Sequence, residues 1–174
     1  MRVEVPQLPR PVENDPRGPS LVRCLTEGAR PLWPGGEVGV ARFPFGPGLA
    51  EALRRARDAG QVARGLETAR ARLAAEERGL RLADRRSGVA RGARVSRLLV
   101  LADDGVERFY RHVETLLRRH GPRVLAVRLE ADAVTLGERV LGPGQLARLL
   151  LLEHKDAVCA VLLALASQGT GAGG

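Results

Sequence analysis

The sequence predicts an α/β protein: a small three-layer α-β-α domain with a mainly parallel sheet, preceded by two basic helices and a proline-rich β arm. Between residues 95 and 168, three apolar runs alternate with three helical patterns, an order typical of parallel strands joined by right-handed crossovers. The 174 residues are 44% hydrophobic but only 3% aromatic. That composition suffices for one ordinary core built from Leu, Val and Ala.

Residues 1–47 are expected to form a proline-rich arm and a β-hairpin. Five of the first twenty residues are proline, which fixes φ and removes backbone donors, so extended chain with a short strand at 2–5 is predicted. Residues 21–26 and 37–43 have the composition of strands, and the Pro/Gly-rich stretch around Trp33 predicts the turn between them.

Residues 48–94 are expected to form a basic helical segment and loop. A first helix begins near Gly48, and a second runs from Val62 to Asp84. The second helix carries a narrow apolar seam formed by Val62, Leu66, Ala69, Leu73 and Leu80. The segment 85–94 contains two glycines and no acid, which predicts a basic loop.

Residues 95–168 are expected to form the α/β core, and 169–174 a flexible tail. Asp104, Asp132 and Asp156 stand at the starts of the three helical patterns, where helix-capping side chains belong. The predicted strands are 97–102, 123–130 and 147–153, and the predicted helices are 106–120, 133–141 and 156–167.

The formal net charge of +8 is concentrated in one part of the chain. Residues 54–97 hold thirteen arginines against five acids, whereas the remaining residues are balanced. A polyanion-binding face needs such asymmetry, because guanidinium groups both neutralise phosphate and bond to it in a fork. A solvated helix face is the alternative, and GC-rich codon usage also explains why 27 of the 28 basic residues are Arg.

Two sets of candidate site residues follow. The RNA-contacting set is Arg64, Gly65, Glu67, Arg70, Arg72, Arg85, Arg86, Arg91, Arg94 and Arg97. The alternative is a ligand site at the strand ends, formed by Asp103, Asp104, His154 and Lys155. Helix capping by the acids competes with that second interpretation. We expect no catalytic residues, metal site or cofactor, because Cys24 and Cys159 lack zinc-ligand spacing and no phosphate-binding glycine loop is present.

Short stretches of the chain are similar to a known family. Residues 53–68, including Gly65 and Glu67, resemble the opening of kink-turn RNA-binding ribosomal proteins, in which a Gly followed by Glu begins the RNA-contacting helix. Residues 98–104 resemble the strand of that family, and Leu136-Gly137 its closing segment. The C-terminal domain of peptide-chain release factors is similar in outline. The resemblance implies a three-layer fold and contact with RNA or the ribosome without catalysis, with Gly65, Glu67 and Arg70 facing the RNA.

Three functions therefore remain open. The first is a non-enzymatic RNA- or ribosome-associated protein that contacts the phosphate backbone. The second is an assembly protein, a homodimer formed through the seam or through the apolar residues 157–166. The third is a small hydrolase or ligand-binding domain that uses the strand-end acids. The longest apolar run is half a membrane span and the N-terminus lacks a signal sequence, so we expect a cytoplasmic protein without a membrane partner.

Overall fold

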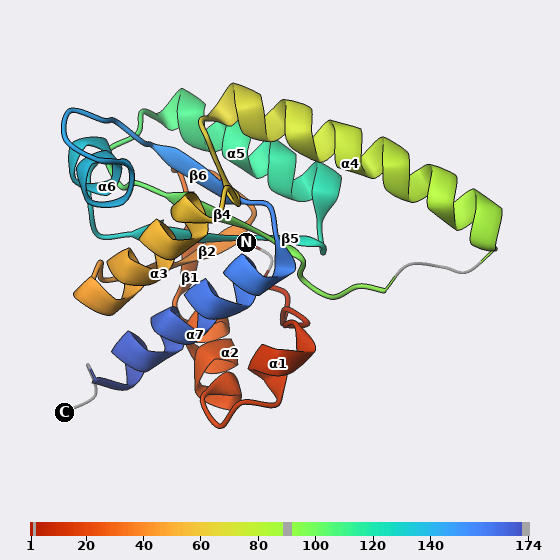
Figure 1. Ribbon diagram of the computed structural model, residues 1–174, viewed down its shortest axis with the longest axis horizontal. Coiled ribbons are helices and arrows are strands. Elements are labelled where there is room, and N and C mark those ends of the chain that lie inside the picture. Colours follow the sequence, from red (N-terminus) through yellow and green to blue (C-terminus); the bar gives the residue numbers. More distant parts are fainter. Residues whose placement is uncertain (2, 89–91, 172–174) are drawn as a thin grey trace.

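The structure is a computed structural model that describes residues 1, 3–88 and 92–171. One open sheet of six strands lies between two layers of helices, as the sequence predicts for a small α/β domain (Figure 1). The strands are β1 (Ala29–Pro31), β2 (Gly39–Phe43), β3 (Val62–Arg64), β4 (Arg97–Leu101), β5 (Val124–Leu129) and β6 (Leu149–Leu152). The helices are α1 (Arg10–Glu13), α2 (Gly18–Glu27), α3 (Pro47–Asp58), α4 (Leu66–Ser87), α5 (Glu107–His120), α6 (Ala133–Leu141) and α7 (Lys155–Gly171).

The sheet is mixed, so the expectation of a mainly parallel sheet is only partly met. Its strand order is β1-β2-β5-β4-β6-β3. The pairs β2–β5 and β5–β4 are parallel, whereas β1–β2, β4–β6 and β6–β3 are antiparallel. The segments 1–47, 48–94 and 95–168 each contribute strands to this sheet. All three segments therefore belong to the same layered structure.

The direction of β6 corrects the sequence prediction. Leu98 pairs with Leu152 and Leu101 with Leu149, so β6 runs against β4. Hydrophobicity predicts that a strand is buried but carries no information on its direction, which here depends on the path from α6 back to the sheet. The short loop at 142–148 returns the chain at the same edge from which α6 left.

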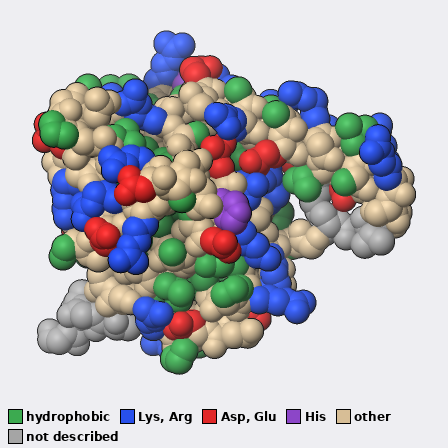
Figure 2. Space-filling model, viewed as in Figure 1, with side chains coloured by type: hydrophobic (Ala, Val, Ile, Leu, Met, Phe, Trp, Pro, Cys, Tyr) green, Lys and Arg blue, Asp and Glu red, His purple; other side chains and the backbone are tan. Residues whose placement is uncertain are grey.

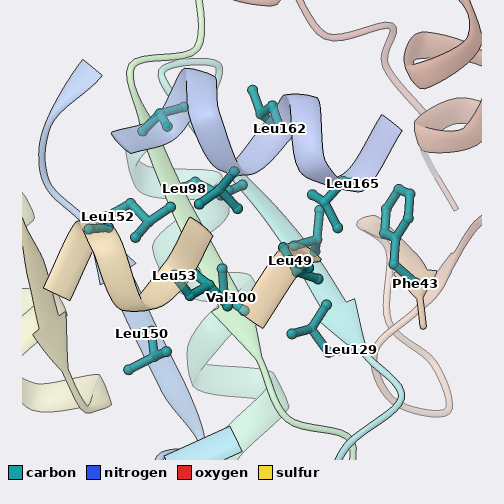
Figure 3. Close-up of a cluster of buried hydrophobic side chains, with 14 of the residues drawn as sticks. Phe43, Leu49, Leu53, Leu98, Val100, Leu129, Leu150, Leu152, Leu162 and Leu165 are labelled. Carbon is teal, nitrogen blue, oxygen red and sulfur yellow. The ribbon is translucent and has the colours of Figure 1, made fainter. Parts of the chain in front are cut away.

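One face of the sheet is covered by α2, α3, α6 and α7. Figure 3 shows the centre of this core, where Leu49 and Leu53 of α3 and Leu162 and Leu165 of α7 meet the sheet residues Leu98 and Val100. Helix α7 is almost wholly apolar because it lies between the sheet and its neighbours α2 and α3. Its buried residues are Ala157, Val158, Val161, Leu162, Leu165 and Ala166.

The other face is covered by α4 and α5. Ala69 and Leu73 of α4 are fully buried there against Leu99, Leu101 and neighbouring sheet residues. The seam of α4 and the apolar face of α7, on which the expected homodimer rested, are thus used inside the single chain. A homodimer is still a prediction, but these two surfaces no longer support it.

The N-terminal region departs most from the sequence prediction. Residues 3–5 form no strand, Arg2 lies outside the described residues, and 21–26 belong to α2. Prolines are compatible with both α1 and α2 because each helix has one in its first turn, where no intrahelical N–H bond is needed. Leu21 and Leu25 are buried at a spacing of four, which is the helical period. The predicted hairpin around Trp33 exists, with β1 as its first strand.

The start of the second predicted helix is also different. Val62–Arg64 forms β3 at the edge of the sheet, and α4 begins only at Leu66. Gly65 joins them with φ 96°, a left-handed conformation that favours glycine. Within the described residues, no helix is long and apolar enough to cross a membrane.

Candidate nucleic-acid interface

Helix α4 carries five of the ten predicted RNA-contacting residues and extends well past the sheet (Figure 1). Its 22 residues correspond to about 33 Å. The first half is anchored by Ala69 and Leu73, whereas Leu82 in the second half is 53% exposed. Arg70 and Arg85 are therefore separated by about 22 Å along the helix axis. The predicted arginines thus form a first group at the start of α4, Arg64, Arg70 and Arg72, and a second group at its end, Arg85 and Arg86.

The three arginines of the first group have partners within the chain. Arg70 bonds to Glu67 at 2.9 Å, and Arg72 lies 3.3 Å from Glu153. Arg64 donates to the side-chain oxygen of Gln145 at 2.8 Å. These pairs are partly or largely exposed and contribute little stability, but each partner must be displaced before a phosphate can bind.

Arg94 and Arg97 are structural. Arg94 bonds to the Glu13 carboxylate and donates to the backbone oxygen of Leu8, which ties the N-terminal segment to the chain before β4. Arg97 bonds to Glu76 at 3.0 Å. The sequence gives no reason to separate these two from other arginines, because their partners lie far away in the chain.

The outer face of α4 carries three unpaired arginines. Within the part of the chain that the structure describes, Arg78, Arg85 and Arg86 form no hydrogen bond or ion pair, and all three are exposed. Arg91 lies outside the described residues. Residues 78, 82, 85 and 86 follow the i, i+4, i+7, i+8 spacing of one helix face, turned away from Ala69 and Leu73. Figure 2 shows basic side chains on the protruding end of the helix.

We call Arg78, Leu82, Arg85 and Arg86 the outer stripe. Arg78 is absent from the set predicted from the sequence, although it stands one heptad before Arg85 and the spacing is readable. Two of the three free arginines, Arg85 and Arg86, stand in the last helical turn, where cations also interact favourably with the helix dipole.

A cluster of charged groups holds the middle of α4 to the body. Glu76 accepts bonds from Arg97 and from Arg123 at 2.9 Å. Glu77 lies 3.8 Å from both Arg123 and the Nδ1 atom of the buried His120. Burial, reinforced by the positive charge of Arg123, lowers the pKa of His120 below its usual range. This cluster fixes where the protruding half of the helix begins.

The predicted ligand site at the strand ends is not assembled. Asp103 pairs with Arg42 at 2.9 Å, and Asp104 accepts the backbone N–H of Ala133 at 3.0 Å. His154 and Lys155 follow β6, which runs against β4, so they lie at the opposite edge of the sheet. The convergence of the four residues, expected from parallel strands, is therefore wrong. Among the described residues, no group of three or more His, Cys, Asp or Glu side chains is placed to hold a metal ion.

No protein-family model and no curated protein matches this chain.

Proposed function

We propose that the protein is a non-enzymatic RNA-binding protein of the cytoplasm, ribosome-associated, that contacts the phosphate backbone through the outer stripe of α4. The observation that carries the proposal is the set of three free arginines on one exposed face of a helix that extends beyond the body. Free guanidinium groups bind phosphate without first breaking an internal ion pair.

The rest of the molecule favours backbone contact over base recognition. The chain has only five aromatic residues, and Trp33 is engaged by Arg111 and Glu114 at the hairpin, so stacking platforms for bases are scarce. The formal net charge of +8 attracts polyanions over a range of about 30 Å at an ionic strength of about 0.01 M. Shape and phosphate positions would then determine which RNA binds.

The test replaces Arg78, Arg85 and Arg86 together by Gln and measures RNA affinity against salt concentration. If the outer stripe neutralises three phosphates, the slope of log affinity against log salt should become shallower by roughly two to three. Folding should hardly change, since exposed, unpaired side chains contribute within about 0.5 kcal/mol each.

The matched control replaces Arg10, Arg23 and Arg108 by Gln. These three are also exposed and unpaired within the described residues, but they lie on α1, α2 and α5. Net charge falls equally in both variants, so equal changes in slope would assign RNA binding to overall charge and remove the outer stripe from the proposal. If duplex DNA of the same length bound with equal affinity, the ligand would be nucleic acid in general rather than RNA.

A further inference from the structure

The sheet opens into a cleft between the first halves of β2 and β5. The two strands pair only from Ala41 to Phe43 against Val127 to Leu129. The residues before these pairs diverge and line a cleft of about 840 Å³, together with the end of α5 and two extended segments at 4–7 and 93–95. This site is separate from the outer stripe and rests on none of the residues of the RNA proposal.

Strand edges form two walls of the cleft. Residues 39–40 pair with β1 on one side, and 124–126 pair with β4 on the other, so in each strand the opposite edge is turned toward the cleft. Alternate N–H and C=O groups of a strand point to each side. An inserted strand would therefore meet backbone donors and acceptors from both walls.

The walls of the cleft include apolar side chains. Val40, Val95 and Val124 are buried in its walls, and Leu125 is half-buried. The N-terminal segment forms a further wall and is held in place because the carbonyl oxygen of Gln7 accepts the N–H of Val95 at 2.8 Å. These features suit apolar side chains at alternate positions of an extended segment.

The rim of the cleft is acidic in a protein that is otherwise basic. Glu4 and Glu37 are exposed there, and among the described lining residues the one cation, Arg118, bonds to Glu37 at 2.6 Å. Arg118 also lies 3.9 Å from the buried Glu114 carboxylate. Among the described residues, two rim carboxylates and one shared guanidinium leave local negative charge for a cationic partner.

We propose that this cleft binds an extended peptide segment of alternating apolar and basic residues, by strand addition between β2 and β5. Apolar side chains enter the cleft, basic side chains face Glu4 and Glu37, and the peptide backbone bonds to the open strand edges. The partner is a protein segment of that pattern, and RNA binding by α4 leaves the cleft free to receive it.

The experiment measures fluorescence anisotropy of the peptide Val-Lys-Val-Lys-Val-Lys-Val, carrying an uncharged fluorophore, with the full chain. The protein and this peptide both carry net positive charge, so long-range electrostatics disfavour nonspecific binding. Saturable binding is expected. A peptide with Pro in place of the central Lys should bind at least tenfold more weakly, because it lacks one backbone donor and one basic side chain.

Two protein variants locate the binding. Ala93→Trp fills the cleft from an exposed wall position and should weaken binding at least tenfold, whereas Ala75→Trp, exposed on α4, should leave it unchanged. Absence of saturable binding, equal binding of the proline peptide, or equal effects of the two Trp variants would each overturn the proposal. The variant with Gln at positions 78, 85 and 86 should bind the peptide as the wild type does. Peptide binding therefore tests the cleft even if the outer stripe does not bind RNA.

Discussion

Gly137 of α6 lies directly against the carbonyl oxygen of Gln145, so closely that a Cβ at position 137 would be 2.2 Å from that oxygen. The chain that leads from α6 to β6 crosses the helix at this point, and Cα of Leu146 would be 2.7 Å from the same Cβ. Both neighbours are backbone atoms and cannot move aside as a flexible side chain would. The absent side chain thus determines how closely this loop packs on α6 before β6 begins.

We expect Gly137→Ala to destabilise the protein by about 1 to 3 kcal/mol, the range for overpacked sites. Gly79 is the matched control, because it also lies inside a helix but has nothing within 4 Å of its would-be Cβ. Gly79→Ala should stabilise by about 0.4 to 1 kcal/mol through lower entropy of the unfolded chain. Urea unfolding of both variants measures the change in the free energy of unfolding. If both substitutions stabilise the protein, the close contact at Gly137 does not limit the size of that residue.

Glu114 anchors the hairpin between β1 and β2. Its buried carboxylate accepts bonds from Nε1 of Trp33 and from the backbone N–H groups of Glu37 and Val38. Burial raises the pKa of Glu114, but these donors and nearby Arg118 outweigh it and hold the pKa below the ordinary value of 4.5. The stabilisation is therefore complete above that ordinary value and is lost as pH falls through the lower folded pKa.

Glu114→Ala should cost about 2 to 3 kcal/mol, because it leaves charged-group hydrogen bonds unmade around a buried site. The chain has a single Trp, so its emission reports this hairpin alone and should shift to longer wavelength. Glu107→Ala on the same helix removes only an exposed pair with Arg111 and should change stability by less than about 1 kcal/mol. Unchanged Trp emission in Glu114→Ala would contradict the anchoring role.

The sequence predicted the elements of the C-terminal half closely because their signals are local. Strands β4 and β5 are apolar apart from Arg97 and Arg128, and β6 is wholly apolar. The amphipathic pattern of α5 and its Gly121 end are likewise readable without any tertiary information. The N-terminal half was harder, since the first-turn prolines of α1 and α2 resemble those of extended chain. Strand direction and long-range ion pairs, such as Arg94 with Glu13, depend on contacts that no local pattern contains.

Helix caps show the same limit at single residues. Asp132 caps its own helix, α6, by accepting the N–H of Thr135, as predicted. Asp104 was expected to cap α5, but its side chain accepts the N–H of Ala133, the first residue of α6. Asp104 and Asp132 therefore both serve the first turn of α6. Asp156 was expected to cap α7, yet the cap is the His154 imidazole, whose Nδ1 accepts the N–H of Asp156. Composition identifies a capping residue, but not which helix uses it.

Substitution separates these capping roles. We expect Asp104→Ala to destabilise by about 1 kcal/mol, because the Ala133 N–H loses its acceptor. Asp156→Ala should change stability by less than about 0.5 kcal/mol, since that side chain is exposed and receives no backbone bond at the helix start. Thermal unfolding of the two variants at pH 7 compares them directly. A larger effect for Asp156→Ala would reverse the assignment.

The charged cluster beneath α4 should make stability depend on pH near neutrality. Burial and the charge of Arg123 lower the pKa of His120 in the folded state below its ordinary value of 6.5. The unfolded chain then binds a proton first as pH falls, so the free energy of unfolding should decrease from pH 8 toward pH 5.5. One proton limits the slope from this residue to about 1.4 kcal/mol per pH unit.

His120→Gln removes that titration and should flatten the dependence over this range, whatever its effect on stability at a single pH. His112→Gln is the matched control, because His112 is only half-buried on the same helix and touches Arg70. Denaturant unfolding of wild type and both variants between pH 5.5 and 8 measures the slopes. If the wild-type slope survives in His120→Gln, His120 is not the group that takes up the proton, and the cluster that anchors the middle of α4 does not cause the pH dependence.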